Sequence, residues 1–100
     1  MSESASAELS SLRSEIEAID RELIVLIAQR VRAARAVGRA KRAHGLSILD
    51  PAREATVVRR AVEWARAEQL AEEDVREIFW HLIGLSRRAQ LEGHSEATSS

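Results

Sequence analysis

The chain has 100 residues, of which 45% are hydrophobic and 31% are charged, and its formal net charge is −1. A chain of this length forms one domain, and interleaved charges of both signs argue against a nucleic-acid or membrane surface as its main partner. The absence of cysteine excludes disulfides and thiolate chemistry. Residues 1–6 contain no secretory signal and no apolar run reaches membrane-spanning length, so we expect a soluble, cytoplasmic protein.

The first predicted element is a long helix from Ala7 to about Ala43, preceded by a disordered N-terminus over residues 1–6. Its length of roughly 50 Å is too great for a compact monomer of this size, so we expect the helix to pair with a second copy of itself. Gly45, after His44, is suited to the position that follows a helix end. The apolar residues recur at three- and four-residue steps, which is typical of a helix that packs along another helix: Leu9, Leu12, Ile16, Ile19, Leu23 and Leu26.

Two cations, Arg30 and Lys41, stand where this apolar seam should continue. Eleven residues bring the helix back to nearly the same direction, so the two cations share a face and are separated by about 16 Å along the axis. The residues between them are small: Ala33, Ala34, Val37 and Gly38. The two long side chains therefore leave room for a small anion. In the alternative interpretation, both cations extend to solvent at the edge of the helix.

A second helix is predicted after a short linker over residues 46–49. Asp50 is a favoured N-cap and Pro51 a favoured first helical residue, and the helix should run to about Ala67. Its inward residues are expected to be Val57, Val58, Ala61, Val62 and Ala65.

A third helix is predicted from Glu72 to about Leu91, since an acidic first turn suits the helix macrodipole. Its apolar residues are Val75, Ile78, Phe79, Leu82, Ile83 and Leu85. Residues 93–100 are polar and are expected to form a disordered tail. With no strand signal, the fold class is all-α, with one three-helix domain over residues 7–92.

Ser86 and Gln90 continue the apolar stripe of the third helix, so both polar side chains should face inward and need partners. A buried serine commonly bonds to the carbonyl four residues earlier instead, and a glutamine near a helix end is commonly exposed. The pattern alone leaves both alternatives open.

Arg13 lies seventeen residues before Arg30, about 25 Å along the same helix, so the two cannot serve one small ligand within one chain. If two copies of the helix run antiparallel, Arg13 of one copy can approach the other copy. The alternative is a solvated arginine paired with Glu17.

Taken together, these elements resemble the all-helical chorismate mutase family from about Leu9 to Leu91. The family is an intertwined homodimer of three-helix protomers with two equivalent active sites, each of which takes one arginine from the partner's first helix. The resemblance therefore implies that role for Arg13. It rests on Leu12-Arg13, Ile16, Ile19-Asp20, Leu23, Leu26-Ile27, Gln29-Arg30, Val37-Gly38, Lys41, Asp50-Pro51, Arg53-Glu54, Ser86 and Gln90.

The resemblance also implies how the site binds chorismate, which is a dianion. The partner's arginine, Arg30 and Arg53 would bind the two carboxylates, because a guanidinium fork suits them. The remaining roles would be hydrogen bonds to the ether oxygen from Lys41 and Gln90, contacts to the ring hydroxyl from Glu54 and the Asp50 backbone N–H, a carboxylate contact from Ser86, and packing on the ring by Val37. The catalytic residues would be Lys41, Gln90, Arg30 and Glu54.

The implied reaction is the intramolecular [3,3] rearrangement of chorismate to prephenate, an isomerase step of the shikimate pathway toward phenylalanine and tyrosine. It requires no nucleophile, metal or cofactor, so catalysis must come from holding the compact conformer and from stabilising charge on the ether oxygen. The three histidines, His44, His81 and His94, match no active-site position and are interpreted as surface residues. The sequence offers no separate regulatory domain, so we expect no feedback inhibition by phenylalanine or tyrosine through one.

Three alternatives remain. An isochorismate pyruvate-lyase shares the basic positions, but the presence of Glu54 and Ser86 favours the mutase. A mutase of 4-amino-4-deoxychorismate stays open, since Glu54 would bind an ammonium group as readily as a hydroxyl. A non-catalytic helical dimerisation module explains the apolar seam but leaves the inward polar positions without a purpose.

Overall fold

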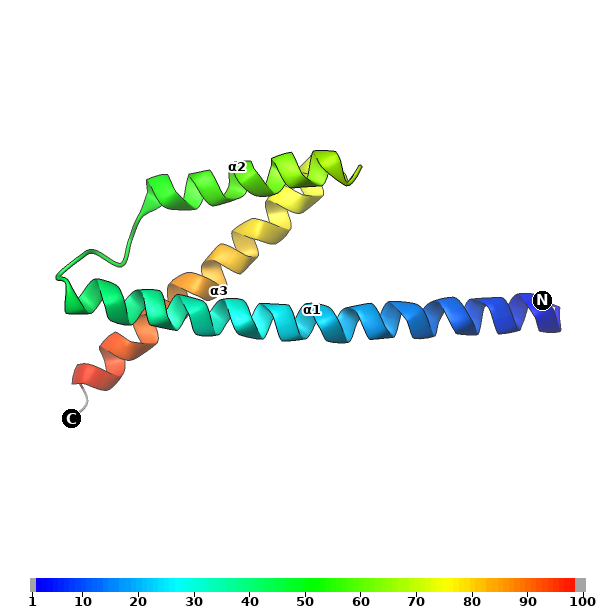
Figure 1. Ribbon diagram of the computed structural model, residues 1–100, viewed down its shortest axis with the longest axis horizontal. Helices are drawn as coiled ribbons and strands as arrows, with labels where there is room; N and C mark the ends of the chain where they lie inside the picture. Colours follow the sequence, from blue (N-terminus) through cyan, green and yellow to red (C-terminus); the bar gives the residue numbers. More distant parts are fainter. Residues whose placement is uncertain (1, 99–100) are drawn as a thin grey trace.

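The computed structural model describes the backbone of residues 2–98 and the side chains of residues 2–92. This part of the chain forms three α-helices and no strand, as predicted for an all-α protein: α1 (Glu3–Ala43), α2 (Pro51–Ala67) and α3 (Glu72–Thr98) (Figure 1). α3 starts beside the end of α2, runs at an angle to it and crosses α1, and it packs against both helices, whereas the backbones of α1 and α2 do not closely approach one another.

Both ends of α1 are capped. The Ser2 side chain accepts a hydrogen bond of 3.1 Å from the Ala5 N–H, which allows the helix to begin at Glu3 rather than at the predicted Ala7. The disorder expected for residues 1–6 stays a prediction, and position 1 lies outside the described residues. At the other end Gly45 has a φ of 66°, and the Leu46 N–H donates to the Lys41 carbonyl at 2.7 Å. This pattern is a Schellman motif and confirms the predicted stop at Gly45.

The start of α2 also agrees with the prediction, because the Asp50 carboxylate accepts from the Arg53 N–H at 3.1 Å and Pro51 is the first helical residue. The end of α2 is closed by a second Schellman motif, in which Gln69 adopts a φ of 59° and the Leu70 N–H donates to the Ala65 carbonyl at 2.8 Å. No glycine marks this turn.

The end of α3 differs from the prediction. The helix continues past the predicted end near Leu91 to Thr98. The disorder expected for residues 93–100 stays a prediction, and positions 99–100 lie outside the described residues. The segment contains no proline, Glu96 and Ala97 are good helix formers, and a single glycine costs only about 1 kcal/mol within a helix.

The core of the chain is small and lies between α2 and α3. Val58, Val62 and Ile83 form a buried cluster with Val57 packed against it, and Ala61 and Ala65 are also buried, which confirms the inward face predicted for α2. Of the apolar residues of α3, Ile83 is buried, whereas Ile78 and Leu85 are exposed.

The N-terminal half of α1 extends away from α2 and α3 (Figure 1). As a result, the radius of gyration is 18.6 Å, against about 13 Å for a compact domain of this length. Five residues of the predicted seam are between 47% and 59% exposed: Leu12, Ile16, Ile19, Leu23 and Leu26. A contiguous apolar stripe of this kind marks an interaction surface.

Candidate active site

A cavity of about 550 Å³ lies where α1, the start of α2 and α3 meet. All of the predicted substrate-binding residues except Arg13 line it. These predicted residues are Arg30, Val37, Lys41, Asp50, Arg53, Glu54, Ser86 and Gln90. Four small or apolar residues complete the wall: Ala33, Ala34, Val57 and Ile83.

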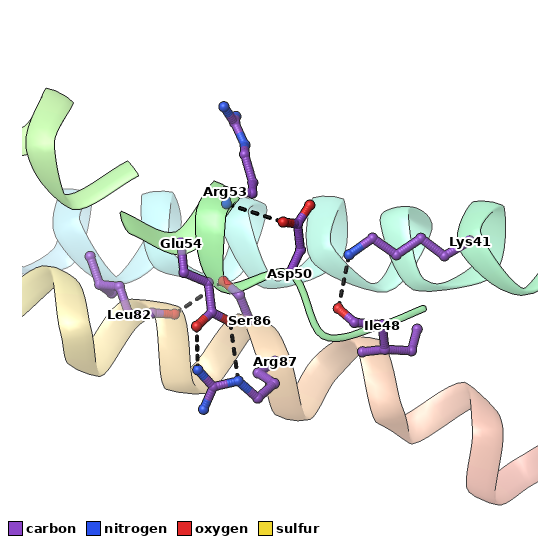
Figure 2. Close-up of polar contacts among 8 residues, drawn as sticks. All are labelled: Lys41, Ile48, Asp50, Arg53, Glu54, Leu82, Ser86 and Arg87. Carbon is purple, nitrogen blue, oxygen red and sulfur yellow. Dashed lines mark hydrogen bonds and ion pairs between the residues drawn. The ribbon is translucent and has the colours of Figure 1, made fainter. Parts of the chain in front are cut away.

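Arg30 is held in this cavity by α3. Its Nη1 donates to the Ser86 hydroxyl and, at 3.4 Å, to the Leu82 carbonyl, so Arg30 does not simply extend to solvent. Ser86 in turn donates to the Leu82 carbonyl at 3.0 Å, which is the local serine bond that the sequence left open (Figure 2). Burial lowers the pKa of Arg30, but a guanidinium stays protonated in proteins.

Lys41 and Gln90 form a second polar corner of the cavity. The Lys41 ammonium donates to the Gln90 Oε1 at 3.0 Å. It also donates to the Ile48 carbonyl at 3.0 Å, which ties the loop after α1 to the site (Figure 2). Because the amide oxygen of Gln90 faces a cation, its NH₂ group remains a donor for another acceptor. The corner therefore presents a cation and a neutral donor together.

Gln90 is positioned by a close approach of α1 and α3. A Cβ atom at Gly38 would lie 2.7 Å from the Gln90 carbonyl oxygen and 2.8 Å from its Cα, so only glycine fits there. Arg42 reinforces this contact, since its Nη1 donates to the same carbonyl at 2.7 Å. These contacts explain why a small residue precedes Lys41 by one turn.

At the start of α2, Asp50 and Arg53 line the opposite wall. The Asp50 carboxylate caps the helix, and the exposed Arg53 side chain extends away from the other residues drawn in Figure 2. Its guanidinium is thus the cation of this wall with the most freedom to move toward a ligand.

Sequence reasoning missed the residue that contacts Glu54, which is Arg87 of α3. The Arg87 Nη2 and Nε donate to the two Glu54 carboxylate oxygens at 2.5 and 3.1 Å, and this hydrogen bonding, with the charge of Glu54, raises the pKa of Arg87 (Figure 2). Arg87 lies one turn after buried Ile83, and that spacing was the only signal in the sequence that it faces α2.

The charge balance of the cavity suits an anion. Three cations line it (Arg30, Lys41 and Arg53), against the carboxylates of Asp50 and Glu54. The Glu54 carboxylate is neutralised by Arg87, and the Asp50 carboxylate caps a helix, so the cations outweigh the anions available to a ligand. Such a site is chemically suited to bind a molecule with two carboxylates.

Arg13 is not part of this cavity within one chain. It is exposed on the half of α1 that has no neighbouring helix (Figure 1). Its predicted role therefore depends on a second copy of the chain.

Two of the three histidines, His44 and His81, are not among the residues that line the cavity. His44 and His81 are exposed, as predicted for surface residues, and His94 lies outside the residues whose side chains are described. Over the described residues, no group of three His, Cys, Asp or Glu could hold a metal ion. In the same part of the chain, no helix is both long and apolar enough to cross a membrane.

Comparisons with known proteins agree with this geometry. A T-protein of Haemophilus influenzae is 52% identical over 46 residues, which are 46% of this chain and 12% of that protein, so the chain spans only a small part of its length. A solved structure of a conserved hypothetical protein from Pyrococcus furiosus superposes with a TM-score of 0.68 at 36% identity, over 83% of this chain and 95% of the other. Residues 12–91, which contain the whole lining of the cavity together with Arg13, match the sequence model of chorismate mutase type II, and the chain belongs to that family.

Proposed function

We propose that the protein is a chorismate mutase, an isomerase that converts chorismate to prephenate in aromatic amino-acid biosynthesis. The observation that carries the proposal is the cavity in which Arg30, Lys41 and Gln90 meet. It offers two cations and a neutral amide at fixed positions on packed helices.

In this proposal the arginines bind the two substrate carboxylates. Arg30, held beside Ser86 and Leu82, binds one of them, and the serine hydroxyl turns its proton from the Leu82 carbonyl toward the same carboxylate. Exposed Arg53 approaches the substrate from α2. Val37 packs on the ring. Holding both carboxylates selects the compact conformer in which the reacting carbons approach each other, which is the main entropic contribution available to a unimolecular reaction.

The chemical step breaks the C–O bond between the ring and the side chain while a C–C bond forms, without proton transfer. Negative charge develops on the ether oxygen. Lys41 and Gln90, whose side chains are 3.0 Å apart, would both donate to that oxygen, and such preorganised donors stabilise the transition state more than the ground state. Glu54 and the Asp50 N–H would hold the ring hydroxyl.

We also propose that the active form is an intertwined homodimer in which the partner's Arg13 completes each site. The exposed seam of α1 supports this proposal, since it is apolar over most of the half that has no neighbouring helix. An antiparallel pairing of two copies of α1 would cover the seam and bring Arg13 to the other copy's cavity.

The decisive experiment incubates the purified protein with chorismate, follows its loss by circular dichroism and identifies the product by chromatography. We expect prephenate as the product. In parallel incubations, salicylate with pyruvate from isochorismate would instead identify a lyase, and turnover of 4-amino-4-deoxychorismate alone would identify a mutase of the amino compound. An intact helical dimer that consumes none of the three compounds would contradict the proposal and leave a non-catalytic dimerisation module.

A further inference from the structure

The ion pair between Glu54 and Arg87 connects the cavity with a residue outside it. Glu54 lines the cavity, whereas Arg87 does not, so the guanidinium reaches the carboxylate from the side away from the ligand. Both side chains are partly shielded from water, with 21% of Glu54 and 39% of Arg87 exposed. The carboxylate thus faces a permanent cation on one side and the cavity on the other.

We propose that Arg87 is a specificity-determining residue, which sets Glu54 to accept a neutral hydroxyl rather than a cationic ammonium group on the substrate ring. The inference rests on the proposed function. Each carboxylate oxygen has two lone pairs, so bonds from Arg87 leave acceptor capacity for a substrate O–H. The negative charge of the carboxylate, however, is already balanced by the guanidinium.

An ammonium group in the same place would have to share that carboxylate with Arg87. Two cations on either side of one carboxylate repel each other, and the repulsion opposes the attraction that an unpaired carboxylate would offer. A hydroxyl carries no charge and does not experience this repulsion. Arg87 therefore discriminates between chorismate and 4-amino-4-deoxychorismate without touching either.

The test measures kcat/KM for both compounds at low ionic strength, where charge effects are least screened. Arg87→Gln keeps a donor for Glu54 but removes the charge, and Arg87→Met removes both. We expect each to raise the ratio of kcat/KM for the amino compound over chorismate by about three- to tenfold. Arg87→Lys keeps the charge and should retain the wild-type ratio. Arg88→Met, at the exposed neighbouring position, is the matched control and should leave the ratio unchanged.

A merely structural role would give a different result, because a misplaced Glu54 would slow both substrates without favouring the ammonium compound. Helicity and melting temperature identify variants that fail to fold. Because two neutral variants are made, the test can be carried out if either of them folds. An unchanged ratio in a folded neutral variant overturns the inference while chorismate turnover still supports the proposed function. A wild-type protein that transforms neither compound overturns both.

Discussion

Lys41 and Gln90 illustrate what a single side chain contributes to this site. A lysine alone would supply charge, but its 3.0 Å bond to the Gln90 Oε1 also fixes which end of the amide faces inward. The amide donates at every ordinary pH, so Gln90 would serve an anionic oxygen without an acid–base requirement of its own.

Replacing Gln90 by glutamate tests this assignment. An ionised carboxylate only accepts hydrogen bonds and would repel the charge that develops on the ether oxygen, whereas the protonated form can donate. Lys41 favours the ionised form, so Gln90→Glu should lose activity near neutral pH by about 10²–10³-fold and regain it as the pH falls. The measurement is kcat/KM against pH for both proteins. Parallel profiles across the acid range would remove Gln90 from the mechanism.

Some residues of the cavity carried a local signal in the sequence, whereas the roles of the others came from the resemblance to the chorismate mutase family. Arg30 and Lys41 interrupted an apolar seam, and Asp50 with Pro51 marked a helix start. Arg87 carried only a weak signal, its spacing of one turn from Ile83. Its contact with Glu54 depends on the angle at which α3 crosses α2, which no local pattern specifies.

Among the elements, the contact between α1 and α3 depends on one glycine. Ala in place of Gly38 would put a Cβ 2.7 Å from the rigid backbone of Gln90 and push the helices apart. We expect Gly38→Ala to destabilise the fold by about 1–3 kcal/mol in urea unfolding and to lower kcat/KM by about 10²-fold.

Gly84 is the matched control for that substitution. A Cβ there would meet only the Arg88 Nη1, at 3.4 Å, which is the movable end of a long side chain. Gly84→Ala should therefore stabilise α3 by about 1 kcal/mol through helix propensity. Equal effects of the two substitutions would contradict the close approach at Gly38.

The end of α2 carries a strained residue that glycine would relieve. Gln69 has a φ of 59°, and a left-handed conformation costs a residue with a side chain about 1–2 kcal/mol. After the larger entropy of glycine in the unfolded chain is subtracted, Gln69→Gly should raise the free energy of unfolding by about 0.5–1 kcal/mol. Glu68→Gly, at a φ of −93°, should not stabilise the protein. Chemical denaturation measures both, and a destabilising Gln69→Gly would refute the argument.

Helix boundaries were predictable where capping residues stood at the expected offset, as Asp50 and Gly45 did. They were less so at the two ends of the chain. Ser2 was an available N-cap signal, but a polar terminus also fits a frayed segment. The turn at Gln69 forms without its usual glycine, so the sequence located a connection there without predicting its conformation.

The whole molecule is extended, measuring 63 × 33 × 15 Å, because half of α1 has no neighbour in the chain. For the proposed dimer, light scattering at micromolar concentration should give twice the chain mass. Dilution should reduce helicity and mass together. A stable, fully helical monomer would contradict the intertwined arrangement and the role of Arg13.

Mixing two inactive variants tests whether the sites are shared. Arg13→Ala and Lys41→Ala should each be nearly inactive. After subunit exchange, one site of each heterodimer would contain both wild-type residues, so about half of the wild-type activity per heterodimer should return. Each variant incubated alone under the same conditions is the control. Exchange demonstrated by mass spectrometry without recovered activity would place Arg13 outside the site.

The exposed seam of α1 also has a consequence for mutational tolerance. In the proposed dimer, which has a two-fold axis, every substitution would occur twice in the interface, so its cost to association would double. A change that weakens packing by about 0.7 kcal/mol per copy would alter the dimer dissociation constant about tenfold. At low cellular concentration, conservative replacements such as Ile16→Val would therefore reduce the fraction of assembled sites, although they lie far from any reacting atom.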